Sequence, residues 1–388
     1  MHKSHDSDWQ CNACTSTRRL TLRLSVIAAS VCSTCLAQGA EPIVLGQTFI
    51  GSGPVAAFSA EPVLGIKAML ATVNRAGGIG GRQIVLSQLD DENSPEKAEA
   101  NVRKLAQQGA IAILMPIGTF PAIGAMKVAN ELKIPVLGPY TGAEQVYAVG
   151  SSVFPMRISF AEEAARIVKH TVLIGQTRMA AVRIDNPGAK LPIDAARRDL
   201  QARGSDLIGE LVLAQDGSDA EIKARQLAAL SPQSIIMSAS NLAAGRFIKA
   251  YQATGTTSQF YCTSFLNGNQ LHKDLGDAAK GVVVMQVVPS PRAAIRLATE
   301  FRASMAAIGA STQLSYSSFE GYIAAKALVE ALRKAPASLK SPAGIQQALQ
   351  AMNGHDLGGM TISFQNQARG ALNFGELSMI GRNGAFVR

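Results

Sequence analysis

Residues 111–143, IAILMPIGTFPAIGAMKVANELKIPVLGPYTGA, decide the fold class of this chain. The stretch opens with a wholly apolar run at 111–115, which is typical of a parallel strand covered on both faces. Residues 116–121 then break any regular element, a helical pattern covers 122–132, and a second apolar run follows at 134–138. This order of strand, helix and strand predicts an α/β fold built on a parallel sheet.

Two loops, 116–121 and 139–143, leave the carboxyl ends of these neighbouring strands. Ligands in open α/β sheets bind at that edge, so the loops are a candidate binding site. Each loop supplies a glycine, a hydroxyl group and an aromatic ring: Gly118, Thr119 and Phe120 in one, and Gly142, Thr141 and Tyr140 in the other. Glycine lets backbone N–H groups approach a ligand, and a hydroxyl group donates or accepts hydrogen bonds. Two ordinary surface turns remain an equal alternative.

The chain has 388 residues, which is long enough for two domains with cores of their own. Its formal net charge is +9 at pH 7. The basic residues are scattered, without a dense run and without interleaved aromatic residues. Nucleic-acid binding is therefore not indicated, although the excess could favour an anionic ligand.

Residues 1–40 have the pattern of a signal peptide with an N-terminal extension. A positive region, Arg18, Arg19 and Arg23, precedes an apolar run at 24–37 that is too short to span a bilayer. Small residues at Ala37 and Gly39 predict cleavage near 38–41. We therefore expect an exported protein.

Four of the five cysteines, Cys11, Cys14, Cys32 and Cys35, fall in this leader. Their spacing matches a zinc-site template, but the apolar export core between them argues against a metal site. We expect no metal and no other cofactor. A lipid anchor at Cys35 remains open. The mature chain would keep Cys262 alone, as a buried core residue without a disulfide partner.

Gly51–Ala56 matches the dinucleotide-binding pattern G-x-G-x-x-A. That pattern requires a helix that starts at the glycines and an acidic residue at the end of a strand about 20 residues later. Pro54 and Pro62 predict a helix that is delayed to about Val63, and no such acidic residue follows. We interpret the segment as an open loop that carries Phe58.

Six further motifs occur in a fixed order: Asn74–Arg82, Leu89–Asp91, Ser94–Ala98, Leu275–Val282, Ser315–Tyr322 and Asp356–Gly359. Their order and spacing resemble the solute-binding proteins of branched-chain amino acid (Leu/Ile/Val-binding) ABC transporters, over about residues 41–388. The resemblance implies an α/β type I periplasmic binding protein. Such a protein has two Rossmann-like lobes with parallel central sheets, joined by a three-stranded hinge.

The resemblance also implies where the chain passes between the lobes. The crossings are expected near 154–159, 287–291 and 360–364. Lobe 1 would then comprise residues 41–157 and 289–360, and lobe 2 would comprise residues 158–288 and 361–388. Hinge closure around a ligand is the motion expected of two lobes joined in this way.

In lobe 1 the resemblance implies that Phe58 covers the ligand. It further implies that Gly118–Thr119 and Tyr140–Thr141 hold a ligand carboxylate through hydroxyl and backbone N–H groups. These loops keep the residue types of the related proteins. We therefore expect lobe 1 to hold the carboxylate.

In lobe 2 the sequence departs from the related proteins. Asn186 precedes a proline where many relatives carry an aromatic lid, and Asn241 stands where others have tyrosines. Ser264 stands where amino-acid binders place a glutamate against the ligand's ammonium group. A buried ammonium group without a carboxylate partner is costly, so the pattern favours a carboxylate-bearing ligand over a zwitterionic amino acid. Ordinary turns and helix caps are an equal alternative for these three residues.

No catalytic constellation is present in the sequence. His170, His272 and His355 are far apart, and there is neither a G-x-S-x-G elbow nor a phosphate-binding lysine loop. The leading hypothesis is a monomeric periplasmic solute-binding component that delivers a small carboxylate-bearing solute to ABC permease subunits in the inner membrane. A sensor of the same fold that signals to a membrane partner is one alternative. An oxidoreductase that uses Gly51 and Gly53 is another.

Overall fold

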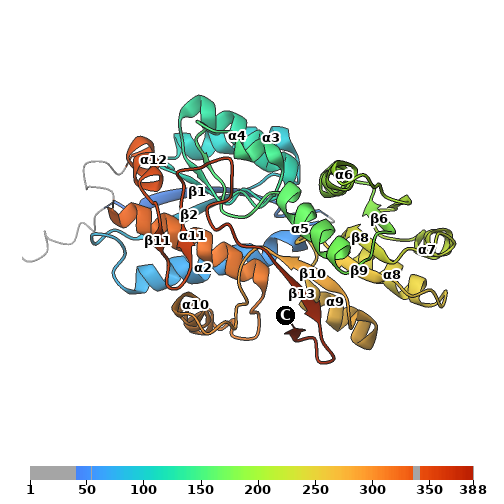
Figure 1. Ribbon diagram of the computed structural model, residues 1–388. Helices are drawn as coiled ribbons and strands as arrows, with labels where there is room; N and C mark the ends of the chain where they lie inside the picture. The colour runs from blue at the N-terminus through green and yellow to red at the C-terminus, as the bar shows by residue number, and fades with distance from the viewer. Residues whose placement is uncertain (1–40, 54, 335–340, 388) are drawn as a thin grey trace, which may run out of the picture. The chain divides into compact units, whose positions relative to one another are not determined.

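The computed structural model describes residues 41–53, 55–334 and 341–387 (Figure 1). The predicted leader and its four cysteines lie outside the described residues. The described chain forms a five-stranded sheet, a seven-stranded sheet and a two-stranded hairpin. None of the described helices combines the length and the apolar character that a bilayer crossing would need.

The first sheet has the strand order β2-β1-β3-β4-β5, and all its neighbouring strands are parallel. The strands are β1 (Ile43–Phe49), β2 (Ile84–Asp90), β3 (Ile113–Leu114), β4 (Val136–Leu137) and β5 (Val153–Phe154). Ile113 pairs with Val136, which confirms that the two apolar runs of the opening stretch are neighbouring parallel strands. The loops that follow β3 and β4 therefore leave the same edge of the sheet.

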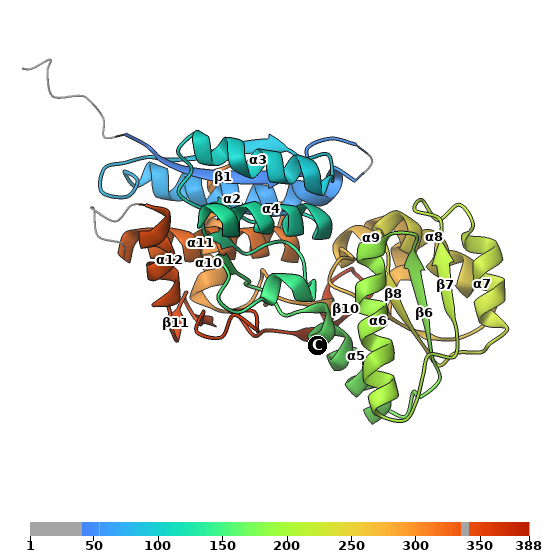
Figure 2. The same ribbon diagram turned by 90° about the horizontal axis from the view of Figure 1, so that it is seen from above.

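Helices pack on the first sheet in two apolar clusters (Figure 2). One cluster includes residues of α3 (Pro95–Gln107) and α4 (Thr119–Leu132), and the short 3₁₀ helix η1 (Glu144–Tyr147) joins it. The larger cluster includes residues of α2 (Ala57–Arg75), α10 (Arg296–Ala307), α11 (Tyr316–Lys334) and α12 (Pro342–Gln350). Residues far apart in the sequence thus share one core.

The second sheet has the order β14-β13-β10-β9-β8-β6-β7. Its parallel strands are β6 (Met179–Ile184), β7 (Glu210–Leu213), β8 (Ser234–Ser238), β9 (Gln259–Cys262) and β10 (Val283–Gln286). Its helices are α5 (Phe160–Leu173), α6 (Pro187–Ala202), α7 (Ala220–Ala228), α8 (Asn241–Gln252), α9 (Gly268–Leu275) and the 3₁₀ helix η2 (Gly276–Ala279). The predicted α/β architecture with two Rossmann-like lobes is confirmed.

The edge of the second sheet differs from the all-parallel expectation. β13 (Glu376–Ile380) is antiparallel to β10, and β14 (Phe386–Val387) is antiparallel to β13. The turn between β13 and β14 is closed by a hydrogen bond from the N–H of Gly381 to the carbonyl oxygen of Ala385, so the chain reverses within a few residues. A reversal that short can form only a hairpin, because a parallel connection needs a crossover.

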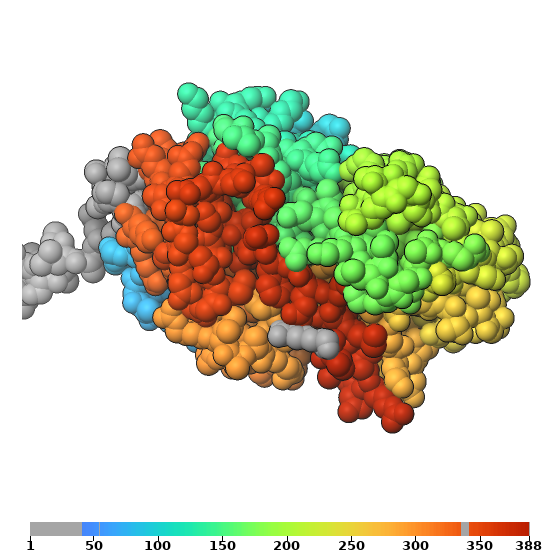
Figure 3. Space-filling model, in the orientation of Figure 1, coloured from blue at the N-terminus to red at the C-terminus, as the bar shows by residue number. Residues whose placement is uncertain are grey.

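The packing of residues 361–372 bears on where the third crossing between the lobes lies. Ile362 and Leu372 lie in the same buried cluster as the first sheet, and Ile362 ends the hairpin of β11 (His355–Asp356) and β12 (Thr361–Ile362). Leu372 N–H then donates to the carbonyl oxygen of Met156, so this segment runs beside the first crossing. In the space-filling view the C-terminal residues form a band across this face (Figure 3). We propose that lobe 1 extends to Leu372, not to residue 360.

Two helices begin earlier than the sequence predicts. α2 starts at Ala57, not at Val63, and keeps Pro62 inside it. α4 starts at Thr119, not at Ala122, with Pro121 in its first turn. A proline in the first turn sacrifices no helical hydrogen bond, because the N–H groups there have no partner within the helix. Pro62 lies beyond the first turn of α2, and the packing of α2 on α11 outweighs the tendency of this proline to delay the start of the helix.

The early start of α2 removes one of the two arguments against a dinucleotide cradle at Gly51–Ala56, because a helix does follow the glycines directly. The spacing argument remains. The acid that ends β2, Asp90, follows Ala56 by more than the roughly 20 residues of that fingerprint. Asp90 Oδ1 instead accepts a hydrogen bond from the N–H of Gly51 at 2.8 Å.

The backbones of α2 and α11 touch at two glycines. A Cβ atom added to Gly65 would lie 1.7 Å from the carbonyl oxygen of Ser318. A Cβ atom added to Gly321 would lie 2.0 Å from the carbonyl oxygen of Pro62. Neither position has room for a side chain unless the helices separate.

Gly65→Ala should therefore lower the free energy of unfolding by about 1–3 kcal/mol, the usual cost of overpacking a core. Gly245→Ala is the matched control, since Gly245 lies inside α8 and an added Cβ would meet its nearest neighbour at 3.6 Å. Replacing a helical glycine with alanine there should stabilise the protein by about 0.5–1 kcal/mol. Urea unfolding of both variants measures the two effects. Equal responses would contradict the close helix contact.

Candidate functional site

The two loops predicted to bind a ligand meet at the carboxyl edge of the first sheet. Thr119 Oγ1 and Thr141 Oγ1 lie 3.0 Å apart, and the N–H of Ala143 donates to Thr141 Oγ1. Both threonine side chains are buried. The structure thus brings the two hydroxyl groups to one point, while their contact with a ligand stays a prediction.

The glycines in these loops have different physical roles. Gly118 has φ = +96° and precedes α4, which begins without a side-chain cap. Glycine adopts this left-handed conformation at no steric cost. Gly142 is needed for packing, because a Cβ atom there would lie 2.5 Å from Cδ1 of Phe160. Phe120 is 39% exposed on the first turn of α4, unlike the buried ring of Tyr140.

A chain of aromatic rings connects the two lobes. The ring of Phe58 lies 5.2 Å from that of Tyr140 and 5.7 Å from that of Phe265, measured between centroids. Phe265 in turn lies 5.1 Å from Phe160. Phe58 and Tyr140 belong to lobe 1, and Phe265 follows β9 of lobe 2. The expectation that Phe58 is an aromatic cover fits this position, but the two lobe 2 rings were not predicted.

A buried arginine lies beside these rings, in the first crossing segment. Arg157 Nη2 donates to Glu163 Oε1 at 3.1 Å, and Arg157 Nη1 lies 3.7 Å from Glu320 Oε1. The guanidinium carbon lies 5.5 Å from the centroid of the Tyr140 ring. All three charged side chains are almost completely buried. One positive charge is therefore set between two carboxylates, one from each lobe.

Burial and charge shift the pKa values of this group in defined directions. Burial raises the pKa values of Glu163 and Glu320, and Arg157 opposes that rise. Burial acts to lower the pKa of Arg157, but the two carboxylates outweigh it and hold the pKa above its usual value. Burial, followed by the charge of Glu320, raises the pKa of Tyr140. The arginine therefore stays charged.

Ser264, predicted to contact the ligand, is bound to this charged group. Its N–H donates to Glu163 Oε2 at 3.0 Å, its hydroxyl donates to Glu163 Oε1 at 2.8 Å, and Arg157 Nη2 contacts its Oγ. The sequence shows a serine in place of the family's glutamate. The structure places the Glu163 carboxylate directly behind that serine.

The other predicted lobe 2 residues support local structure. Asn186 caps α6, where its Oδ1 accepts from the N–H of Gly188 at 2.8 Å. The Asn241 side chain donates to the carbonyl of Asn267 at 2.7 Å and accepts from its N–H at 3.1 Å. Both are partly buried, and their contact with a ligand stays a prediction.

The beginnings of α4 and α6 face each other across the lobes. A Cβ atom added to Gly188, in the first turn of α6, would lie 3.4 Å from Thr119 Oγ1, in the first turn of α4. The N-terminus of a helix carries a partial positive charge and unpaired N–H groups. At α6 the Asn186 side chain occupies the N–H groups of Gly188 and Ala189, so α6 contributes its partial positive charge, while the uncapped α4 also offers N–H groups; together they favour an anion beside the buried hydroxyl groups.

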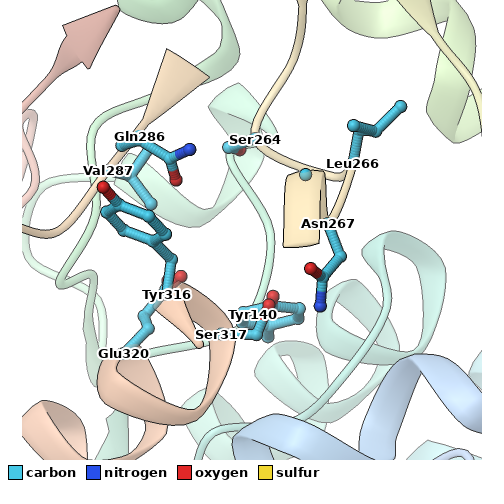
Figure 4. A pocket seen from close by; sticks show the side chains of 10 residues that line it. Tyr140, Ser264, Leu266, Asn267, Gln286, Val287, Tyr316, Ser317 and Glu320 are labelled. Carbon is cyan, nitrogen blue, oxygen red and sulfur yellow. The ribbon is translucent and has the colours of Figure 1, made fainter. Parts of the chain in front are cut away.

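A small cavity of about 20 Å³ lies beside Tyr140 and is lined by residues of both lobes. Polar side chains surround it: Tyr140, Ser264, Asn267, Gln286, Tyr316 and Glu320. Figure 4 shows Gln286 and Tyr316 on one side of the space and Asn267 on the opposite side. This volume holds about one water molecule.

Sequence reasoning missed the charged group of Arg157, Glu163 and Glu320. One signal was available for two of them. Arg157 stands between Met156 and Ile158, and Glu320 stands in the long apolar pattern of α11. Charged residues are seldom fully buried unless they are paired. A charge within an apolar pattern therefore indicates a buried ion pair, but the sequence does not indicate its partners.

Loops from the carboxyl edges of two parallel-stranded lobes thus converge on one polar site. This arrangement defines a ligand-binding protein of the type I periplasmic binding protein fold. A model of the periplasmic binding protein family matches residues 42–381, and the chain belongs to that family.

Individual proteins show the same likeness. The chain resembles a substrate-binding periplasmic protein from Ralstonia solanacearum, with 28% identity and a TM-score of 0.82 over 89% of this chain and 99% of the other. It also resembles an extracellular ligand-binding receptor from Verminephrobacter eiseniae, with 27% identity and a TM-score of 0.81 over 89% of this chain and 100% of the other.

A curated relative matches over a shorter length. The Leu/Ile/Val-binding protein homolog 3 of Brucella melitensis is 27% identical over 108 residues, which is 28% of this chain. The match spans 29% of that relative's length.

Proposed function

We propose that this protein is the periplasmic solute-binding component of an ABC transporter. It captures a small carboxylate-bearing solute, an amino acid or an organic acid, by closure of its two lobes, and it delivers the solute to permease subunits in the inner membrane as a monomer. Membership of the periplasmic binding protein family supports the general function. The proposal of a carboxylate-bearing solute is argued from the geometry of the candidate binding site.

The approach of α4 and α6 is the observation that carries the proposal. Thr119 and Thr141 present their hydroxyl groups where the first turns of these helices face each other. A carboxylate bound there would accept hydrogen bonds from the threonines and from the uncapped first turn of α4. Lobe 1 holds the charge, and the closing lobe 2 selects the rest of the solute through Asn186, Asn241 and Ser264.

A thermal-shift screen of amino acids, aliphatic acids and aromatic acids tests the proposal. A solute at 100 times its Kd should stabilise the protein by about 2.7 kcal/mol. Solutes without a carboxylate serve as the negative set. A screen in which no carboxylate-bearing solute raises the melting temperature would contradict the proposal.

The proposed closure of the two lobes leads to a separate prediction. A solute that binds at the lobe interface should shift the protein from open to closed forms, because the closed form alone contacts it from both lobes. Small-angle scattering at saturating solute should then give a smaller radius of gyration than the same protein without solute. The same protein with a solute that does not bind in the thermal-shift screen, at the same concentration, is the control. An unchanged profile with bound solute would mean that the lobes do not close on it.

A further inference from the structure

A buried carboxylate without a cationic partner lies at the carboxyl edge of the first sheet. Asp91 directly follows β2, and its side chain is 0% exposed. Its Oδ2 accepts a hydrogen bond from Thr48 Oγ1 at 2.7 Å, and its Oδ1 accepts one from the N–H of Asn93 at 2.9 Å. No described lysine, arginine or histidine forms an ion pair with Asp91, and Lys97, the nearest base in the sequence, pairs with Glu92.

The turn that contains Asp91 contacts the loop at 116–121 through Asn93. A Cβ atom added to Gly118 would lie 3.2 Å from Asn93 Oδ1. Gly118 directly precedes Thr119, whose hydroxyl group belongs to the proposed carboxylate site. The backbone of Asn93 thus binds the Asp91 carboxylate while its side chain touches the solute-binding loop. One residue therefore separates the buried carboxylate from that loop.

The backbone fixes the Asp91 carboxylate in this place. The N–H of Asp91 donates to the carbonyl oxygen of Phe49 at 3.0 Å, and its own carbonyl oxygen accepts from the N–H of Ser94 at 2.8 Å. The next two residues, Glu92 and Asn93, have φ values of +49° and +63°, a left-handed conformation that is uncommon for residues other than glycine. Asp91 cannot turn away from an approaching negative charge unless these bonds break.

The surrounding charges do not neutralise Asp91. Strand β1 and the loops at 50–53 and 116–121 carry no titratable side chain. The titratable side chains of the end of β2, the following turn and the first turn of α3 are Asp90, Glu92, Glu96 and Lys97. The ion pair of Lys97 with Glu92 is at the surface, so the charge balance around Asp91 stays negative.

These surroundings make Asp91 a site for a proton. Burial raises the pKa of Asp91 to about 6, the charge of Asp90 adds to the rise, and the hydrogen bonds from Thr48 and Asn93 oppose it. A protonated Asp91 can donate its O–H to Thr48 Oγ1, because a hydroxyl oxygen accepts hydrogen bonds as well as donating them. The side chain can therefore keep its position in both protonation states.

We propose that Asp91 takes up a proton when the solute's carboxylate binds, so that the protein captures its solute more tightly at acidic than at neutral pH. This inference rests on the proposed function and adds regulation by pH to it. A negative charge bound at Thr119 repels the ionised Asp91, and no cation is paired with Asp91 to offset the repulsion. A proton from the solvent removes the repulsion. The coupling is reciprocal, so protonation of Asp91 must in turn favour the bound solute.

Calorimetry of the purified protein between pH 5.5 and pH 8 tests the inference. The probes are the carboxylates of the thermal-shift screen, with leucine, butyrate and benzoate representing its three classes. Binding heats measured in two buffers with different ionisation enthalpies give the number of protons taken up per bound solute. The variants are Asp91→Asn, which is neutral at every pH, and Asp90→Asn.

Asp90→Asn is the matched control, because Asp90 adjoins Asp91 but is exposed. Burial acts to raise the pKa of Asp90, but hydrogen bonds from Ser52, Glu92 and Gly51 outweigh it and hold the pKa below its usual value. Asp90 therefore stays ionised throughout the pH range of the experiment and takes up no proton.

The wild type should bind a probe about three- to sevenfold more tightly at pH 5.5 than at pH 8, and it should take up about 0.3–0.5 proton per bound solute near pH 6.5. Asp90→Asn should keep both effects. Asp91→Asn should lose both, and at pH 8 it should bind about as tightly as the wild type binds at pH 5.5. If Asp91 were needed only for structure, Asp91→Asn would melt at a lower temperature and still take up the proton.

Thr48→Val is a second variant, which keeps Asp91 but removes the hydrogen bond that favours its ionised form. Its affinity should change with pH over a higher range than that of the wild type. Tight binding by the wild type without pH dependence or proton uptake would overturn the inference and leave the proposed function standing. Proton uptake that persists in Asp91→Asn but is lost in Glu320→Gln would overturn the role of Asp91. Absence of binding by every probe would overturn both proposals.

Discussion

Arg157→Met should lower the free energy of unfolding by about 3–5 kcal/mol, which is the usual cost of removing one partner of a buried ion pair. The substitution leaves Glu163 and Glu320 buried without a cation, and both already have raised pKa values because of burial. It also removes the guanidinium group from the face of Tyr140. Urea unfolding at neutral pH measures the loss.

Two further variants separate the charge effect from packing. Replacing all three groups, as Arg157→Met with Glu163→Gln and Glu320→Gln, should recover much of the stability, because no buried charge then remains unpaired. Arg198→Met is the control, since its ion pair with Glu144 is more than half exposed on both sides and should contribute less than about 1 kcal/mol. A loss for Arg157→Met no larger than the control would contradict a buried ion-paired role.

Thr119→Ala or Thr141→Val should weaken binding of the solute by roughly ten- to a hundredfold, because each removes a hydroxyl group from the proposed carboxylate site. The two hydroxyl groups are hydrogen-bonded to each other, so the loss of either also frees the other to reorient. Calorimetry with the solute found by the thermal-shift screen measures both variants.

Ser264→Ala is the matched lobe 2 variant. Its hydroxyl group is held by Glu163 and Arg157, so its removal should cost less affinity for an acid without an ammonium group than either threonine change. The assignment of the carboxylate site would be wrong if Ser264→Ala abolished binding while both threonine variants kept the wild-type affinity.

Local sequence patterns were sufficient to predict much of the fold. The apolar runs around residues 113 and 136 predicted neighbouring parallel strands, and the structure pairs Ile113 with Val136. A serine followed by a proline is a sequence signal for a helix start, and α3 begins at Pro95, with the Ser94 hydroxyl accepting from the N–H of Lys97. These features depend on residues within one turn or one strand, which is why the sequence carries them.

Patterns in one segment cannot report what packs against it from elsewhere. Pro62 predicted a late start for α2, yet the helix begins at Ala57 because its first turns pack on α11, some 250 residues later in the chain. We propose a later third crossing for the same reason, since Leu372 is buried in the core of the first sheet.

The sequence by itself determined the class of fold, the loops at the edge of the first sheet and the closeness of Thr119 to Thr141. These follow from the order of strands and helices, because parallel strands end at a common edge. The tertiary structure alone decided the charge of the site. Arg157 comes from a crossing segment, Glu163 from α5 and Glu320 from α11, and the sequence around Ser264 does not show the Glu163 carboxylate that accepts its hydrogen bond. Charge acts through space over a few ångströms, so its balance depends on which segments the fold brings together.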